Sequence, residues 1–211
     1  MPPPRLSLPA SFRRRRVPKA TLAARRWTSG LPILRRGAVT LREIEEADGP
    51  AIVALYRLAR VRRHMSQPFK GATEFDAFLE WSRASRLKGR YAGFAIHVAG
   101  TRKAVGMIYA WVTARGVAEL GYALHPSVWG RGVFLPAARA MCDFAFGAMD
   151  IHRLEMRVGA GNHRALAATR KIGARAEGTL RDALITERSH GDAILFSLLS
   201  SDGRPVRSAV G

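Results

Sequence analysis

The most informative part of this sequence is Val128-Trp129-Gly130-Arg131-Gly132-Val133-Phe134. It follows the alternating segment Val117–Leu124, which has the pattern of a half-buried strand, and it precedes a helical pattern over residues 135–149. A strand that leads through a Gly-x-Gly turn into a helix directs free backbone N–H groups toward a ligand at the positive end of the helix dipole. Such a turn binds anions, most often phosphates, and glycine lets them approach the backbone closely.

The length and composition predict one globular domain with an appendage. The chain has 211 residues, of which 47% are hydrophobic, and no apolar run approaches the ~18 residues of a membrane span. A single cysteine, Cys142, excludes an internal disulfide framework and fits a reducing compartment. We therefore expect a cytoplasmic protein without a membrane partner. Because no Cys/His grouping has zinc-site spacing, we expect no metal.

The net charge of +19 is concentrated at the N-terminus, where eleven Lys and Arg precede the first acidic residue, Glu43. Residues 1–37 are proline-rich at their start and carry Arg13–Arg16, so we expect a basic, flexible extension. Three interpretations are open: a solvated extension, an electrostatic tether to the ribosome or nucleic acid through residues 1–36, and a segment similar to an organelle transit peptide.

The pattern of a folded domain runs from residue 38 to residue 200, and residues 201–211 read as a frayed tail. Thr73 is the expected N-cap of a helix that starts near Ala72. The order of elements predicts a mixed α/β layout with a central antiparallel meander. We expect strands at 38–44, 91–98, 104–113, 117–124, 153–158, 179–186 and 192–199, and helices from 46, from 72, over 135–149 and over 162–172.

Further features follow the glycine turn at regular distances. Asn162 opens a helix after Gly159-Ala160-Gly161, Lys171-Ile172-Gly173 closes that helix, and Asp192 begins a final apolar strand. Together with Ala118–Tyr122 upstream, this series resembles the Gcn5-related N-acetyltransferases. It is most similar to the branch that contains ribosomal-protein N-terminal acetyltransferases, and the resemblance covers about residues 38–200.

The resemblance implies a mixed, mainly antiparallel central sheet flanked by helices, in which the fourth and fifth strands (117–124 and 153–158) splay apart. It implies transfer of an acetyl group from acetyl-CoA to a primary amine, either a protein N-terminal α-amine or a small-molecule amine. The turn would bind the diphosphate through backbone amides, and the strand near Leu124 would pair with the pantetheine arm. The implied cofactor contacts are Leu124, Trp129, Gly130, Arg131, Gly132, Val133, Phe134 and Asn162.

Four positions depart from the family pattern. Phe134 replaces the third small residue of the turn, so its side chain must point away from the phosphates. Pro136 replaces a Glu that is common in the family. A proline is acceptable in the first turn of a helix, where the backbone N–H is unpaired anyway. Ala165 replaces a frequent Ser, and Thr169 stands where many relatives have a Tyr general acid. These departures leave the general acid unassigned. They also leave open the alternative that the protein binds acyl-CoA without catalysing a reaction.

Acetyl transfer requires a neutral amine, and an α-amine (pKa about 7.7–8.0) is easier to deprotonate than lysine (about 10.4) by about 3.5 kcal/mol. A site with weak acid–base equipment therefore suits an α-amine. Glu119 and Asn162 are the candidate catalytic residues, Glu119 as base. The alternatives are a structural ion pair for Glu119 and a helix N-cap for Asn162. Tyr122 either positions the substrate or packs as a half-buried strand aromatic. The protein is expected to be a monomer or a homodimer.

Overall fold

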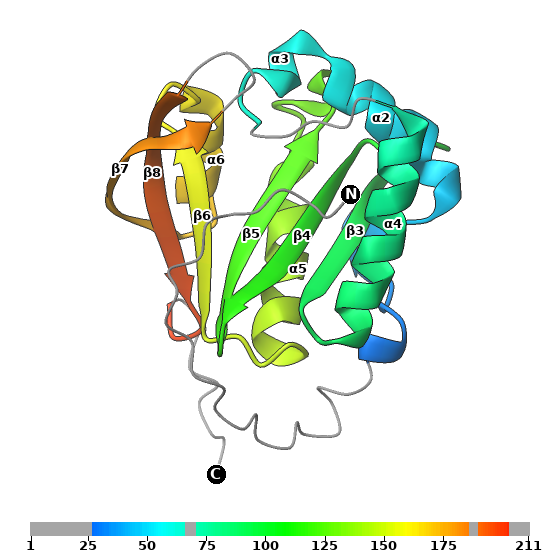
Figure 1. Ribbon diagram of the computed structural model, residues 1–211, viewed down its shortest axis with the longest axis horizontal. Coiled ribbons are helices and arrows are strands. Elements are labelled where there is room, and N and C mark those ends of the chain that lie inside the picture. The colour runs from blue at the N-terminus through cyan, green and yellow to red at the C-terminus, as the bar shows by residue number, and fades with distance from the viewer. Residues whose placement is uncertain (1–26, 66–70, 186–189, 203–211) are drawn as a thin grey trace.

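The computed structural model describes residues 27–65, 71–185 and 190–202, and these residues form an eight-stranded sheet with the order β1-β2-β3-β4-β5-β6-β8-β7 (Figure 1). The strands are β1 (Leu34–Arg36), β2 (Val39–Glu43), β3 (Tyr91–Val98), β4 (Gly106–Ala114), β5 (Val117–Leu124), β6 (Arg153–Gly159), β7 (Arg175–Ile185) and β8 (His190–Leu199). The helices are η1 (Glu46–Asp48), α2 (Gly49–Arg57), α3 (Ala59–Arg62), α4 (Ala72–Leu87), η2 (Pro126–Val128), α5 (Phe134–Gly147) and α6 (His163–Lys171).

The sheet is mainly antiparallel, and its one parallel pair among the described strands is β5–β6. That pair closes the β5–α5–β6 crossover, because parallel neighbours need a long connection that crosses a face of the sheet. The mixed α/β fold expected from the sequence is confirmed. Strands 117–124 and 153–158 of the prediction are β5 and β6, one place further along because β1 was not foreseen.

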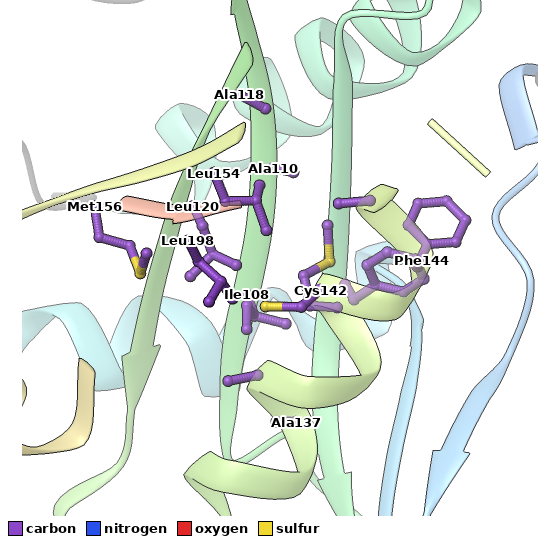
Figure 2. Packing of buried hydrophobic residues seen from close by; sticks show 14 of the residues in the cluster. Ile108, Ala110, Ala118, Leu120, Ala137, Cys142, Phe144, Leu154, Met156 and Leu198 are labelled. Atoms are coloured by element: carbon purple, nitrogen blue, oxygen red, sulfur yellow. The ribbon is translucent and has the colours of Figure 1, made fainter. Parts of the chain in front are cut away.

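Two hydrophobic clusters lie on opposite faces of the sheet. Because side chains alternate along a strand, successive residues of β5 contribute to different clusters. Leu120 and Leu124 belong to the cluster that includes α5, whereas Ala123 belongs to the cluster formed with α2 and α4. Figure 2 shows the first layer, where Ile108 and Leu120 of the sheet face Cys142 of α5. Burial raises the pKa of the Cys142 thiol to about 12, so this cysteine is a neutral core residue.

The folded part begins earlier than the sequence pattern indicated. Trp27 is only 5% exposed, and its ring meets Phe144 of α5 edge-on at a centroid distance of 6.2 Å. Leu34 pairs with Leu41, which places β1 at the edge of the sheet. Residues 27–37, assigned above to the extension, therefore pack on the domain in the described structure. The arginine run at 13–16 and the tail after residue 202 lie outside the described residues.

Two local expectations also change. Helix α4 has Gly71 as its N-cap, so Thr73 lies inside the first turn and does not cap it. Strand β7 begins at Arg175, four residues before the expected start, because the segment pairs with β8 through irregular register. Within the described ranges, no helix is both long and apolar enough to span a membrane.

Candidate functional site

The pairing of strands β5 and β6 ends at Glu119. Their parallel register holds only three residue pairs, and the last joins Glu119 to Glu155. Beyond it β5 continues to Leu124 and β6 to Gly159, and the two strands diverge toward the end that carries α3 (Figure 1). In the part of the chain that the structure describes, each strand therefore presents a backbone edge to the other without a ladder between them.

The backbone groups at this edge can be assigned from the register. His125 N–H donates to the carbonyl of Val105, the residue that precedes β4, at 2.8 Å. Because bonding directions alternate along an antiparallel pair, the N–H and C=O groups of Tyr122 and Leu124 point away from β4, toward β6. The Leu124 carbonyl accepts a hydrogen bond from Trp129 Nε1 at 2.8 Å. The amide groups of Tyr122 and Leu124 are thus the donors directed at a ligand between the strands.

The glycine turn leads from this edge into α5. Gly130 and Gly132 both have a φ of +73°, a left-handed conformation that L side chains rarely adopt. A Cβ at either position would meet nothing within 4 Å, so the backbone conformation, not space, requires glycine. Helix α5 starts at Phe134 after Val133, with no side-chain cap on its first N–H groups. The exposed turn containing Arg131 therefore offers backbone donors and positive charge to an anion.

Phe134 does not enter the turn. Its ring packs on that of Tyr122 with 4.4 Å between centroids, so its side chain points toward the sheet, as the departure from the family pattern required. Burial raises the pKa of Tyr122 to about 12, which fits a packed aromatic residue. Tyr122 therefore lies on the face of the sheet covered by α5.

Trp129 joins three elements at the open end of the strands. The guanidinium carbon of Arg164, from α6, lies 4.0 Å from the centroid of its ring, and that of Arg60, from α3, lies 5.5 Å away. The pKa of His64 is lowered by burial and by the nearby charges of Arg63 and Arg164. Arginines thus gather around the turn, and a binding site for anions needs this charge.

Asn162 stands at the end of β6, opposite the turn. Its side-chain oxygen accepts a hydrogen bond from Ala165 N–H at 3.2 Å, which caps α6. Its own N–H donates to the Gly159 carbonyl at 2.8 Å, which fixes the residue at the end of the strand. The N-cap role is therefore present, and only the side-chain amide nitrogen is left for a ligand.

Glu119 occupies the point where the strands separate, on the face opposite Tyr122. Its side chain is 19% exposed, and its Oε2 lies 3.7 Å from Arg157 Nη1. Burial raises the pKa of Glu119, Arg157 opposes that rise, and Glu155 adds to it. The ion pair expected as the alternative role exists, but it is long and half-exposed. A carboxylate with a raised pKa remains suited to accept a proton near neutral pH.

The sheet therefore brings some of the expected residues together and separates others. Leu124, the turn and Asn162 surround the open end, whereas Glu119 and Tyr122 face opposite sides. Sequence reasoning missed Tyr109, which pairs with Gly121 across β4 and β5. A Cβ on Gly121 would collide with the ring and hydroxyl of Tyr109, so this phenol lies directly over β5. The available signal was a glycine inside a strand, which marks a close approach.

Comparison with known proteins places this chain in a family. Residues 38–175 match the family model described as an acetyltransferase (GNAT) domain. The chain therefore belongs to the GNAT family, and it is an N-acetyltransferase whose acyl donor is acetyl-CoA. The splayed strands and the glycine turn fit this donor. Among the described residues, no group of three or more His, Cys, Asp or Glu could hold a metal ion.

Individual relatives agree with this assignment. The chain is 26% identical over 170 residues to the N-acetyltransferase p20 of Bacillus licheniformis, covering 78% of this chain and 94% of the relative. Among solved structures, RimJ of Mycobacterium smegmatis in complex with CoA-disulfide has a TM-score of 0.71 at 24% identity, covering 82% of this chain and 88% of that one. The ribosomal-protein-S5-alanine acetyltransferase of Vibrio fischeri has a TM-score of 0.73 at 16% identity, covering 82% and 100%. These structures share the fold.

Proposed function

We propose that this enzyme acetylates the α-amine of a protein N-terminus, with acetyl-CoA held between β5 and β6. The observation that carries the proposal is the separation of these strands after Glu119, next to the glycine turn. The diphosphate would be bound by the amides of residue 130 and residues 132–134, beside the charge of Arg131, whose own N–H donates to the Val128 carbonyl. The acyl arm would lie along β5, where the amides of Tyr122 and Leu124 face it.

The chain's own groups supply two parts of the reaction. Backbone N–H groups on β5 stabilise the negative charge that develops on the thioester oxygen, and fixed donors of this kind are worth about 3–4 kcal/mol. Glu119 accepts the proton of the attacking amine, directly or through water. Thr169 is fully buried, and its hydroxyl has no hydrogen-bond partner among the described residues. A hydroxyl so placed cannot exchange its proton with solvent, so we assign it no acid role.

The charge around the opening supports an α-amine over a polyamine. Arg60, Arg63 and Arg164 lie near Trp129 and His64, at the end where the strands are open. A polyamine would bring several positive charges close to these arginines, and like charges repel. A peptide N-terminus brings one amine, which must be neutral to react. The α-amine also loses its proton more readily than lysine.

The proposal is tested in two stages. Saturating acetyl-CoA at a hundredfold over Kd should stabilise the protein by about 2.7 kcal/mol, on the order of 5–10 °C in Tm for a domain of this size. ATP at equal ionic strength is the polyanion control. Thiol release is then followed with peptide N-termini, a lysine side chain and a polyamine as acceptors. Stabilisation without turnover would favour a non-catalytic acyl-CoA-binding protein, and preference for the polyamine would refute the α-amine.

An N-terminal tether to the ribosome or nucleic acid is a separate proposal, because the arginine-rich residues 1–26 lie outside the described residues. It predicts RNA binding that weakens steeply with salt and is lost when residues 1–26 are removed. Acetyl-CoA binding should survive that removal, because the described site includes none of these residues.

A further inference from the structure

The distance along β5 raises a difficulty for Glu119 as a direct base. A strand rises about 3.3 Å per residue, so the Cα atoms of Glu119 and Tyr122 are roughly 10 Å apart, and those of Glu119 and Leu124 roughly 16 Å. The backbone donors for the thioester oxygen lie at these two positions. A glutamate side chain spans only part of either distance. A group between them is needed to carry the proton.

Tyr109 fills that interval. It pairs with Gly121, two residues beyond Glu119 toward the open end, and its ring and hydroxyl lie over the Gly121 backbone. Glu119 and Gly121 point to the same face, because side-chain directions alternate along a strand. The Tyr109 ring is stacked on Tyr91 with 5.5 Å between centroids, which fixes its orientation. Among the described residues its hydroxyl has no hydrogen-bond partner, so it is available to a substrate.

The phenol is also in the right protonation state. Burial and the negative charge of Glu119 both raise the pKa of Tyr109 well above its usual range. The hydroxyl therefore keeps its proton at neutral pH. A neutral phenol can accept a hydrogen bond through its oxygen and donate one through its hydrogen at the same time.

We propose that Tyr109 relays the proton of the acceptor amine to Glu119, an inference that rests on the proposed function. As the amine nitrogen attacks the thioester carbon, the C–N bond forms and the amine proton passes to the Tyr109 oxygen. The phenol proton passes at the same time, through one bridging water, to the Glu119 carboxylate. The C–S bond then breaks, the CoA thiolate leaves, and solvent protonates it. Tyr109 is unchanged, and Glu119 returns its proton to water.

The test compares Tyr109→Phe with Tyr91→Phe. Both changes remove one hydroxyl from a stacked pair of tyrosines, so each controls for packing in the other. We expect Tyr109→Phe to lower kcat about 100-fold, the lower range of general base catalysis, with the KM for acetyl-CoA and the Tm shift by acetyl-CoA unchanged. Tyr91→Phe should remain within twofold of the wild type. Gly121→Ala, which places a methyl group where the phenol lies, should reproduce the loss without removing the hydroxyl.

The pH profile separates a relay from a structural role. In the wild type, the rise of kcat/KM with pH should contain a step from Glu119. Tyr109→Phe and Glu119→Gln should both lose that step, and the double variant should be no slower than the slower single variant. A Tyr109→Phe enzyme that keeps the step, or that stays within twofold of the wild type, would overturn the relay. If the wild type acetylates no amine at all, the proposed function fails first, and the relay fails with it.

Discussion

Replacing Asn162 separates its two roles, because Ala and Asp remove different atoms. The side-chain oxygen caps α6 through Ala165 N–H at 3.2 Å. Asn162→Ala removes this acceptor and should cost about 1 kcal/mol, within the usual 0.5–2 for an N-cap. For a domain of this size that lowers Tm by about 2–4 °C. Asn162→Asp keeps an acceptor oxygen and should leave Tm within about 1 °C of the wild type.

Both variants lose the side-chain N–H donors, which are the part of Asn162 left for the cofactor. One hydrogen bond contributes about 0.5–1.5 kcal/mol, which is roughly a 2- to 12-fold increase in Kd for acetyl-CoA. The added negative charge of Asp should make its loss equal or larger. Thermal unfolding without ligand and calorimetric titration with acetyl-CoA measure the two quantities independently. Wild-type affinity in Asn162→Asp would show that the residue only caps the helix.

Three further predictions concern stability. Gly132→Ala should cost about 1 kcal/mol in urea unfolding, because its φ is left-handed, whereas Gly147→Ala at the end of α5 should be neutral or stabilising; equal losses would contradict this reasoning. Because burial raises the pKa of Glu119, its contribution to stability is fully present below the unfolded value and is lost as pH rises through the folded one. Glu119→Gln should therefore gain stability relative to the wild type between about pH 4.3 and neutrality, and a difference that does not vary with pH would be evidence against the raised pKa. Trp27→Ala should cost about 3–5 kcal/mol, since the ring is 5% exposed and packs on Phe144; a loss below 1 kcal/mol would return residues 27–37 to the extension.

The elements around the glycine turn were predictable because their signals are local. Strand Val117–Leu124 was expected with the bounds it has, since alternation and flanking turns define it. The placement of Glu119 and Tyr122 on opposite faces of the sheet could also be predicted, because residues three apart on a strand face opposite sides. By contrast, Trp27 and β1 lie in an arginine-rich, acid-free segment. Their place depends on contacts with α5, which no local pattern reveals.

The cross-strand pairing of Tyr109 with Gly121 could not be predicted by counting residues from the hairpin turn. Ala114 pairs with Val117 next to the hairpin turn, and continuing that register would set Ala110 opposite Gly121. An irregularity between Val112 and Ala114 shifts the pairing by one residue. A one-residue shift moves every later side chain to the other face. A bulge in β4 therefore determines the position of Tyr109, and no sequence signal predicts this bulge.

The irregular outer strands of the sheet have a consequence for solubility. Strand β1 has three residues, and β7 has two shifts of register with Asp182 at a φ of +50°. Short, bent and charged edges resist pairing with strands of other molecules. Within the described sheet, a further stretch of backbone without a ladder lies inside the molecule, between β5 and β6. The edge strands of the sheet thus resist aggregation, whereas the unpaired backbone groups between β5 and β6 are available to a small ligand.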